Sequence, residues 1–184
     1  MDEWIKHIIS IKGFFLDDRR LISYVSHRPG NGDISLIWEK MNTMAHQLNG
    51  EVLLPKHSLV QVKKLGLDAA LTRGDLSVVN RMAHEFSGDE FTLVQLISRY
   101  CAAHAPEHYP LWGRHSLNAL ELKCGVRFAP DDYETYSTLI RAIRSGNGMR
   151  QLNFFDINKF FWIYEHQLKI ADFDIPNELF AHLK

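Results

Sequence analysis

The sequence predicts an all-α fold in a single compact domain. Apolar residues recur at helical spacing along most of the chain, and helix caps, glycines and prolines separate the periodic segments. No segment keeps the alternation of polar and apolar residues that is typical of a β-strand. A chain of 184 residues is long enough for one sizeable core and short for two. We therefore expect eight to ten helices in one domain that covers residues 1–184.

The composition is that of an ordinary globular protein, with 46% hydrophobic and 23% charged residues. A formal net charge of −1 and a pI near 6.8 give no overall basicity that would attract a nucleic acid or a membrane surface. No apolar run approaches the roughly 18 residues that a membrane span requires, and no secretory leader opens the sequence. We expect a cytoplasmic protein without a membrane partner, in which Cys101 and Cys124 are reduced, buried thiols.

The first third of the chain contains two short helices and one longer helix. Residues 1–25 have helical spacing that Gly13 interrupts, which predicts two short helices. Residues 27–32, HRPGNG, form the clearest loop. Asp33 is then a good N-cap for a helix whose apolar residues continue to Leu48, and Asn49 with Gly50 ends it.

Residues 52–86 predict shorter elements. Residues 52–54 favour an extended piece before Pro55, followed by a helix over residues 58–65 that Gly66 ends. One helical turn over residues 68–72 comes next. A further helix begins at Gly74 and Asp75.

A long central helix begins at Ser87, because Ser87 and Glu90 form a Ser-x-x-Glu capping box. Its apolar stripe ends at His104, and Pro106 stops the helix. After a loop, helical spacing resumes at Ser116. Pro130 and the acidic residues that follow it predict the start of another helix, which ends at Gly146. Asp156 is the expected cap of the next helix. We expect one short helix in the tail after residue 170.

The candidate binding residues gather around the loop between the central helix and its successor: Arg99, His104, His108, Tyr109, Trp112, Arg114, His115 and Lys123. Standard catalytic signatures are absent, including a P-loop, a GxSxG elbow and an HExxH helix. A catalytic residue therefore cannot be named from the sequence.

A metal site formed by His104, His108 and His115 is disfavoured, because Pro106 interrupts the helix face and no carboxylate or cysteine completes a ligand set. We expect no metal and no cofactor, and we interpret His104 as a core histidine bonded to a backbone carbonyl. Nucleophilic catalysis by either cysteine is also disfavoured, because both fall on apolar stripes, where burial makes a thiol inert.

A basic and aromatic surface is the remaining candidate. Arg114 and His115 stand at the start of a helix, where free backbone N–H groups favour an anion, and Trp112 would offer a stacking surface. A solvated helix face explains the same charges equally well.

The sequence leaves two functions open. One is a non-catalytic protein that contacts nucleic acid, another anion or a protein through residues 99–123. The other is an enzyme of unrecognised type with a pocket around His104, Tyr109, Trp112 and His115.

The run RYCAAHAPEHYPLW, residues 99–112, contains the pattern Tyr-Cys-x-x-His-x-Pro-Glu-x-Tyr-Pro. In this pattern the chain resembles a group of uncharacterised bacterial helical proteins, which implies a helical fold and no particular activity. More distantly, the helix, the loop with proline and the next helix start are similar to the second half of helix-hairpin-helix DNA glycosylases. That resemblance implies DNA as a partner. It implies no base excision, because Gly113 stands where those enzymes have a catalytic aspartate.

Overall fold

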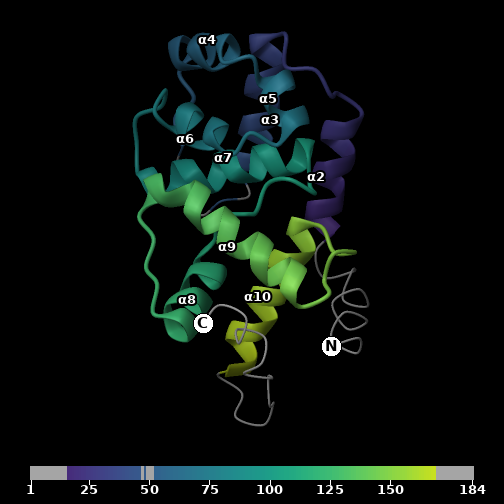
Figure 1. The fold of residues 1–184 in the computed structure, drawn as a ribbon. Helices are drawn as coiled ribbons and strands as arrows, with labels where there is room; N and C mark the ends of the chain where they lie inside the picture. The colour runs from purple at the N-terminus through teal and green to yellow at the C-terminus, as the bar shows by residue number, and fades with distance from the viewer. Residues whose placement is uncertain (1–15, 47, 49–51, 169–184) are drawn as a thin grey trace.

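A computed structural model describes residues 16–46, 48 and 52–168 of the chain. Within these ranges every regular element is a helix, which confirms the all-α prediction (Figure 1). The helices are α2 (Leu16–Ser26), α3 (Ile34–Ala45), α4 (Lys56–Lys64), α5 (Leu67–Arg73), α6 (Ser77–Ala83), α7 (Glu90–His104), α8 (Arg114–Cys124), the 3₁₀ turn η2 (Pro130–Asp132), α9 (Tyr133–Gly146) and α10 (Phe154–Leu168). None of them is long and apolar enough to cross a bilayer.

Helix α7 is the element around which the others are arranged. Helices α2, α3 and α6 pack directly against it, and α4 packs on α3. Figure 1 shows α3 to α6 on one side of α7 and α8 to α10 on the other, with α8 packed against α10. The backbone N–H of Phe154, at the start of α10, donates to the Pro106 carbonyl at 3.0 Å. This bond ties the end of α7 to the second group of helices.

Aromatic side chains fill the space between the two groups. The Trp112 ring lies 4.9 Å from the Tyr136 ring and 6.4 Å from the Tyr133 ring, measured between centroids. The hydroxyls of Tyr133 and Tyr136 donate to the carbonyls of Pro110 and Leu111, at 2.7 Å and 2.5 Å. Core residues therefore fix the backbone of the loop that follows α7, and this loop forms part of the site described below.

Several predicted helix limits agree with the structure. Asp33 caps α3 as expected, because its carboxylate accepts from the Ser35 N–H at 2.9 Å. Residues 27–32 form a loop, and residues 52–54 lie outside any helix. The first short helix expected before Gly13 and the short helix expected in the tail lie outside the described residues.

Four predicted limits are wrong, by a few residues each. The side chain that caps α7 belongs to Asp89, which accepts from the Thr92 N–H at 2.9 Å, so the capping box at Ser87 does not form. Asn153 rather than Asp156 caps α10, because its side-chain oxygen accepts from the N–H of Asp156 at 3.0 Å. Helix α3 ends at Ala45 instead of continuing to Leu48. Gly74 has a left-handed φ of 66° and ends α5, so α6 begins only at Ser77.

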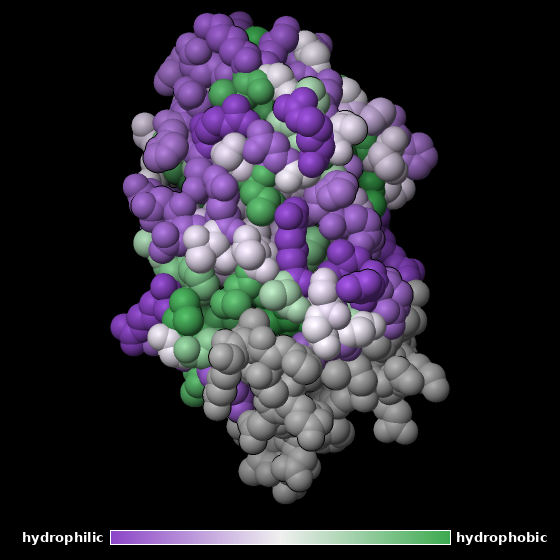
Figure 2. All heavy atoms as spheres, viewed as in Figure 1, coloured by the Kyte–Doolittle hydropathy of each residue, from purple (hydrophilic) through white to green (hydrophobic). Residues whose placement is uncertain are grey.

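The surface is mostly polar over α4, α5 and α6 in the upper part of Figure 2. Apolar residues gather lower in the same view, around α8 and α9. Leu122 and Val126, near the end of α8, are among the exposed large apolar side chains of the described part. Apart from such positions, the apolar side chains form one continuous core from Leu21 in α2 to Tyr164 in α10.

Candidate functional site

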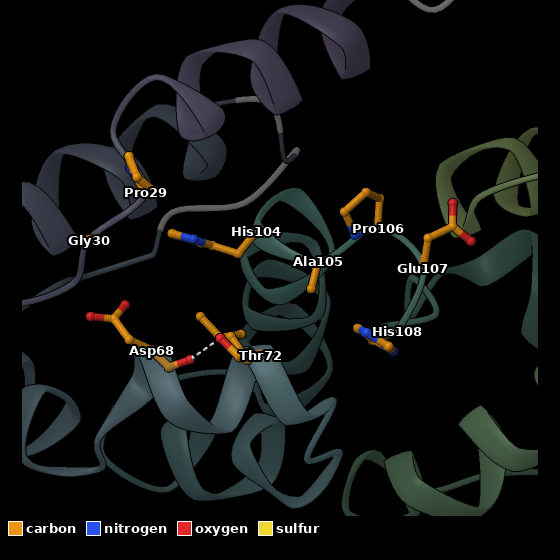
Figure 3. A pocket seen from close by; sticks show the side chains of 10 residues that line it. Pro29, Gly30, Asp68, Thr72, His104, Ala105, Pro106, Glu107 and His108 are labelled. Carbon is orange, nitrogen blue, oxygen red and sulfur yellow. Dashed lines mark hydrogen bonds between the residues drawn. The ribbon is translucent and has the colours of Figure 1, made fainter.

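A pocket of about 560 Å³ lies where the end of α7 meets the loop before α3 and the outer face of α5. Its lining consists of Pro29, Gly30, Asp68, Leu71, Thr72, His104, Ala105, Pro106, Glu107 and His108. In Figure 3, Asp68 and His104 lie on the same side as Gly30, whereas Glu107 and His108 lie on the opposite side. The pocket therefore has two polar ends, separated by small apolar residues.

A buried lysine lies directly behind the Asp68 end. Lys40 is fully buried, and its ammonium donates to the Gly30 carbonyl at 2.7 Å and to the Asn31 side-chain oxygen at 3.1 Å. Its third neighbour is Nε2 of His104, at 3.4 Å. An ammonium has three N–H donors, and here each donor has one acceptor.

Asn31 connects this ammonium to the pocket. Its backbone N–H and its side-chain amide both donate to the Asp68 carboxylate, at 3.3 Å and 2.7 Å. The Tyr100 hydroxyl donates to the Asn31 side-chain oxygen at 2.5 Å. Lys40, Asn31, Tyr100, His104 and Asp68 thus form one polar network, which starts in the core and ends at an exposed carboxylate.

Burial controls the ionisation of the two basic groups in this network. Burial lowers the pKa of Lys40 to about 8, although the nearby Asp68 carboxylate opposes this shift. Burial and the Lys40 charge lower the pKa of His104 to about 3, again against Asp68. His104 is therefore neutral at physiological pH. Because Lys40 donates to Nε2, the single proton of the neutral ring lies on Nδ1.

The structure places the predicted site residues in several different environments. His104 and His108 line the pocket. Tyr109 is buried, and its hydroxyl donates to the carbonyls of Ala70 and Asp75 at 3.1 Å and 3.2 Å. Trp112 is only 1% exposed, so the prediction that its indole offers a stacking surface is wrong. The interpretation of His104 as bonded to a backbone carbonyl is also wrong, because the partner of its Nε2 is Lys40.

The predicted cationic residues contact three different elements. Arg99 pairs with Asp18 of α2 at 3.5 Å. The Arg114 guanidinium lies over the Phe91 ring at the start of α7, 5.7 Å from its centroid. The Lys123 ammonium lies over the Tyr164 ring of α10, at 5.8 Å. These contacts give no sign of one continuous basic face, so the nucleic-acid reading of residues 99–123 stays a prediction.

The two thiols have no disulfide partner. Cys101 is fully buried and Cys124 is half-buried, and burial raises the pKa of both thiols. A thiol with a raised pKa is a poor nucleophile at neutral pH, as the sequence predicts.

The sequence did not point to Lys40, Asn31 and Asp68, which form the polar network beside the pocket. One signal for Lys40 was present, because it lies three residues after Ile37 on the buried stripe of α3. A charged residue in an apolar stripe needs a partner, but the sequence does not show which partner.

The HI_0787_N family model, described as an N-terminal domain, matches residues 1–108. The chain belongs to this family. All residues that line the pocket lie between Pro29 and His108, inside the matched region. The match ends in the loop between α7 and α8, and its description names no activity. No curated protein and no solved structure matches the chain, and the likeness to DNA glycosylases stays a prediction.

Proposed function

We propose that this chain is a non-catalytic binding protein that holds a small organic amine in the pocket beside His104. The observation that supports this function is the position of the Asp68 carboxylate, which is exposed at the end of the polar network. Two donors of Asn31 hold the carboxylate in place, and its exposed edge can accept further hydrogen bonds.

The size and the lining of the pocket suit a small organic molecule. A volume of about 560 Å³ lies within the usual range of ligand pockets, which is roughly 300–1,000 Å³. Pro29, Leu71, Ala105 and Pro106 supply apolar contact for the body of a ligand. Asp68 at one end supplies the charge that orients it.

The charges favour an amine over an anion. Asp68 and Glu107 both line the pocket, and no lysine or arginine does. Glu107 is already paired with Arg144 of α9, so Asp68 is the carboxylate that we assign to the ligand. The nearby ammonium of Lys40 is buried behind Asn31 and already has three acceptors. A carboxylate or phosphate group would therefore meet the negative charge of Asp68 with no lysine or arginine in the lining to neutralise it, whereas an ammonium would pair with Asp68.

The ionisation of His104 favours binding over acid–base catalysis. A general base works best when its pKa lies near the working pH, and the pKa of His104 is about 3. The neutral ring is instead suited to donate one hydrogen bond from Nδ1 to a ligand.

Isothermal titration calorimetry with two probes of similar shape tests this proposal. We expect 2-phenylethylamine, an ammonium on an aromatic body, to bind measurably, and 3-phenylpropionate, a carboxylate on the same body, not to bind. Asp68→Asn should weaken amine binding by at least about tenfold, as expected for the loss of a charge-assisted hydrogen bond worth about 1.5–3 kcal/mol. Asp131→Asn, at an exposed carboxylate that does not line this pocket, is the matched control and should bind as the wild type does.

Thermal unfolding of each variant separates loss of the site from loss of the fold. Equal binding of the two probes, or amine binding that Asp68→Asn leaves unchanged in a folded protein, would contradict the proposal. Selective binding of 3-phenylpropionate would also contradict it and would show that the pocket is an anion site.

A further inference from the structure

Three potential metal ligands meet on the opposite side of α7, between α8 and α10. His115 lies in the first turn of α8, and Glu165 and His166 lie near the end of α10. One ligand atom from each side chain lies within 4.8 Å of the others, and in the described part of the chain no other group of His, Cys, Asp and Glu does this. All three residues are partly buried. The His115 side chain is 35% exposed and that of Glu165 is 18% exposed, so an ion from solvent can reach them.

Neighbouring groups orient two of the three ligands. Nδ1 of His166 lies 2.8 Å from the Trp162 carbonyl. Because a carbonyl only accepts, Nδ1 must carry the proton, and the lone pair of His166 is therefore on Nε2. The Asn118 amide donates to Oε1 of Glu165 at 2.9 Å, which leaves Oε2 directed at His115. Such outer contacts are typical of sites in which histidine and carboxylate ligands hold a metal.

We propose that His115, Glu165 and His166 bind one Zn²⁺ ion, through one ring nitrogen of His115, the Glu165 carboxylate and Nε2 of His166. Two imidazoles and one carboxylate are a common ligand set for Zn²⁺, and in such sites a water molecule completes the tetrahedron. The nitrogen ligands select against Mg²⁺ and Ca²⁺, which require oxygen.

The geometry requires a small rearrangement. With metal–ligand distances of about 2.0–2.1 Å, two ligand atoms of a tetrahedral zinc site lie roughly 3.3 Å apart. In the structure, Nδ1 of His115 contacts the Glu165 carboxylate directly. The ion would enter between these two groups and replace this contact, while His166 closes in from the next position on α10.

This site is independent of the amine pocket. Residues 115, 165 and 166 lie beyond the segment that matches the family, which ends at residue 108. Because α8 and α10 pack against each other, a bound ion would also join the two helices by coordination. Zinc should therefore raise the unfolding temperature of the protein.

Calorimetric titration of the metal-free, full-length protein with ZnCl₂ tests the proposal, with MgCl₂ as the comparison ion. We expect one zinc equivalent to bind the wild type and no magnesium to bind. His166→Ala and Glu165→Gln should each remove this equivalent. Asn118→Ala should keep it with an affinity about 10–100-fold lower, because Asn118 only orients Glu165.

The matched control is His57→Ala, which removes an exposed histidine of α4 and should leave zinc binding unchanged. Co²⁺ offers a second readout, since a tetrahedral Co²⁺ site absorbs visible light more strongly than hydrated Co²⁺ does. This absorption should appear in the wild type and in His57→Ala, and it should be absent in His166→Ala. Glu165→Gln nearly conserves the shape of the side chain and keeps the test valid if His166→Ala does not fold. No zinc equivalent in the wild type, or an equivalent that persists in Glu165→Gln, would overturn the proposal.

Discussion

Two histidines of this chain, His104 and His115, show how neighbouring charges decide what an imidazole can do. His104 lies beside the buried ammonium of Lys40, and its pKa is lowered to about 3 by burial and by that charge. His115 is partly buried and lies against the carboxylate of Glu165. The environment of His104 keeps its ring neutral, so that the ring acts as a hydrogen-bonding group. The environment of His115 pairs an imidazole with a carboxylate, as metal sites commonly do.

The network behind the pocket and the cluster at His115 also differ in the groups that hold their side chains in place. The network behind the pocket is fixed by core residues and by backbone groups, including the Gly30 carbonyl and the Asn31 N–H. The cluster at His115 depends on side chains that project from two packed helices. We therefore expect changes at the buried members of the first region, Lys40, Tyr100 and His104, to affect the stability of the fold. Changes in the second region should mainly affect ligand binding.

The largest effect should come from Lys40→Ala. This change removes the donor of three buried or half-buried acceptors and leaves a cavity, so we expect a loss of about 3 kcal/mol in the free energy of unfolding. Lys40→Met fills the space without the charge and should lose less. Urea unfolding measures both values. Lys63→Ala, at an exposed position of α4, should change stability by less than about 0.5 kcal/mol. A Lys40→Ala protein as stable as the wild type would show that the network contributes nothing to the fold.

The second effect is a dependence of stability on pH that belongs to His104. Its pKa is about 3 in the folded protein and about 6.5 in the unfolded chain, so between these values the unfolded chain binds more protons. Stability should therefore fall as the pH falls through this window, by up to about 1.4 kcal/mol for each pH unit. Urea unfolding at pH 6.5 and pH 4.5 should show a smaller difference for His104→Gln than for the wild type. His57→Gln, the exposed control, should keep the wild-type difference. An unchanged difference in His104→Gln would mean that His104 is not held neutral.

A smaller effect should follow from Tyr100→Phe. The change removes the hydroxyl that donates to Asn31, but Lys40 continues to donate to the same oxygen. We expect a loss of about 1 kcal/mol, since the acceptor keeps one partner. Guanidinium unfolding gives the value, and a loss as large as that of Lys40→Ala would show that the hydroxyl, rather than the ammonium, stabilises the network.

The fold could be predicted well because its signals are local. Asp33 precedes a helix with a clear apolar stripe, and both features lie within a few residues of each other. The predicted start of α7 was wrong for a local reason as well. Ser87 and Asp89 are both residue types that cap helices, and both precede a helical segment. The structure is needed to show that the Asp89 carboxylate accepts from the Thr92 N–H.

The site could be predicted only in part, because its contacts join distant segments. His104 was a candidate from its place at the end of an apolar stripe, but its partner Lys40 lies 64 residues earlier in the chain. The partner of His115 likewise lies 50 residues later. Spacing along the sequence identifies pairs within one helix, whereas these pairs arise from the packing of one helix on another.

The smallest effects should come from Arg114→Ala and Lys123→Ala. Each side chain lies over one aromatic ring, Phe91 or Tyr164, and a cation–π contact at an accessible position contributes about 0.5–1 kcal/mol. We expect a loss near the lower value for each change and nearly additive losses in the double variant, because the two contacts involve different elements. Chemical unfolding of the three variants measures these losses.

Fluorescence anisotropy with labelled single- and double-stranded oligonucleotides at low salt tests whether residues 99–123 form a basic binding surface. Because these cations contact separate elements, the double variant should behave as the wild type does. A clear loss of oligonucleotide affinity in the double variant, with its fold intact, would instead show that residues 99–123 do form a nucleic-acid surface.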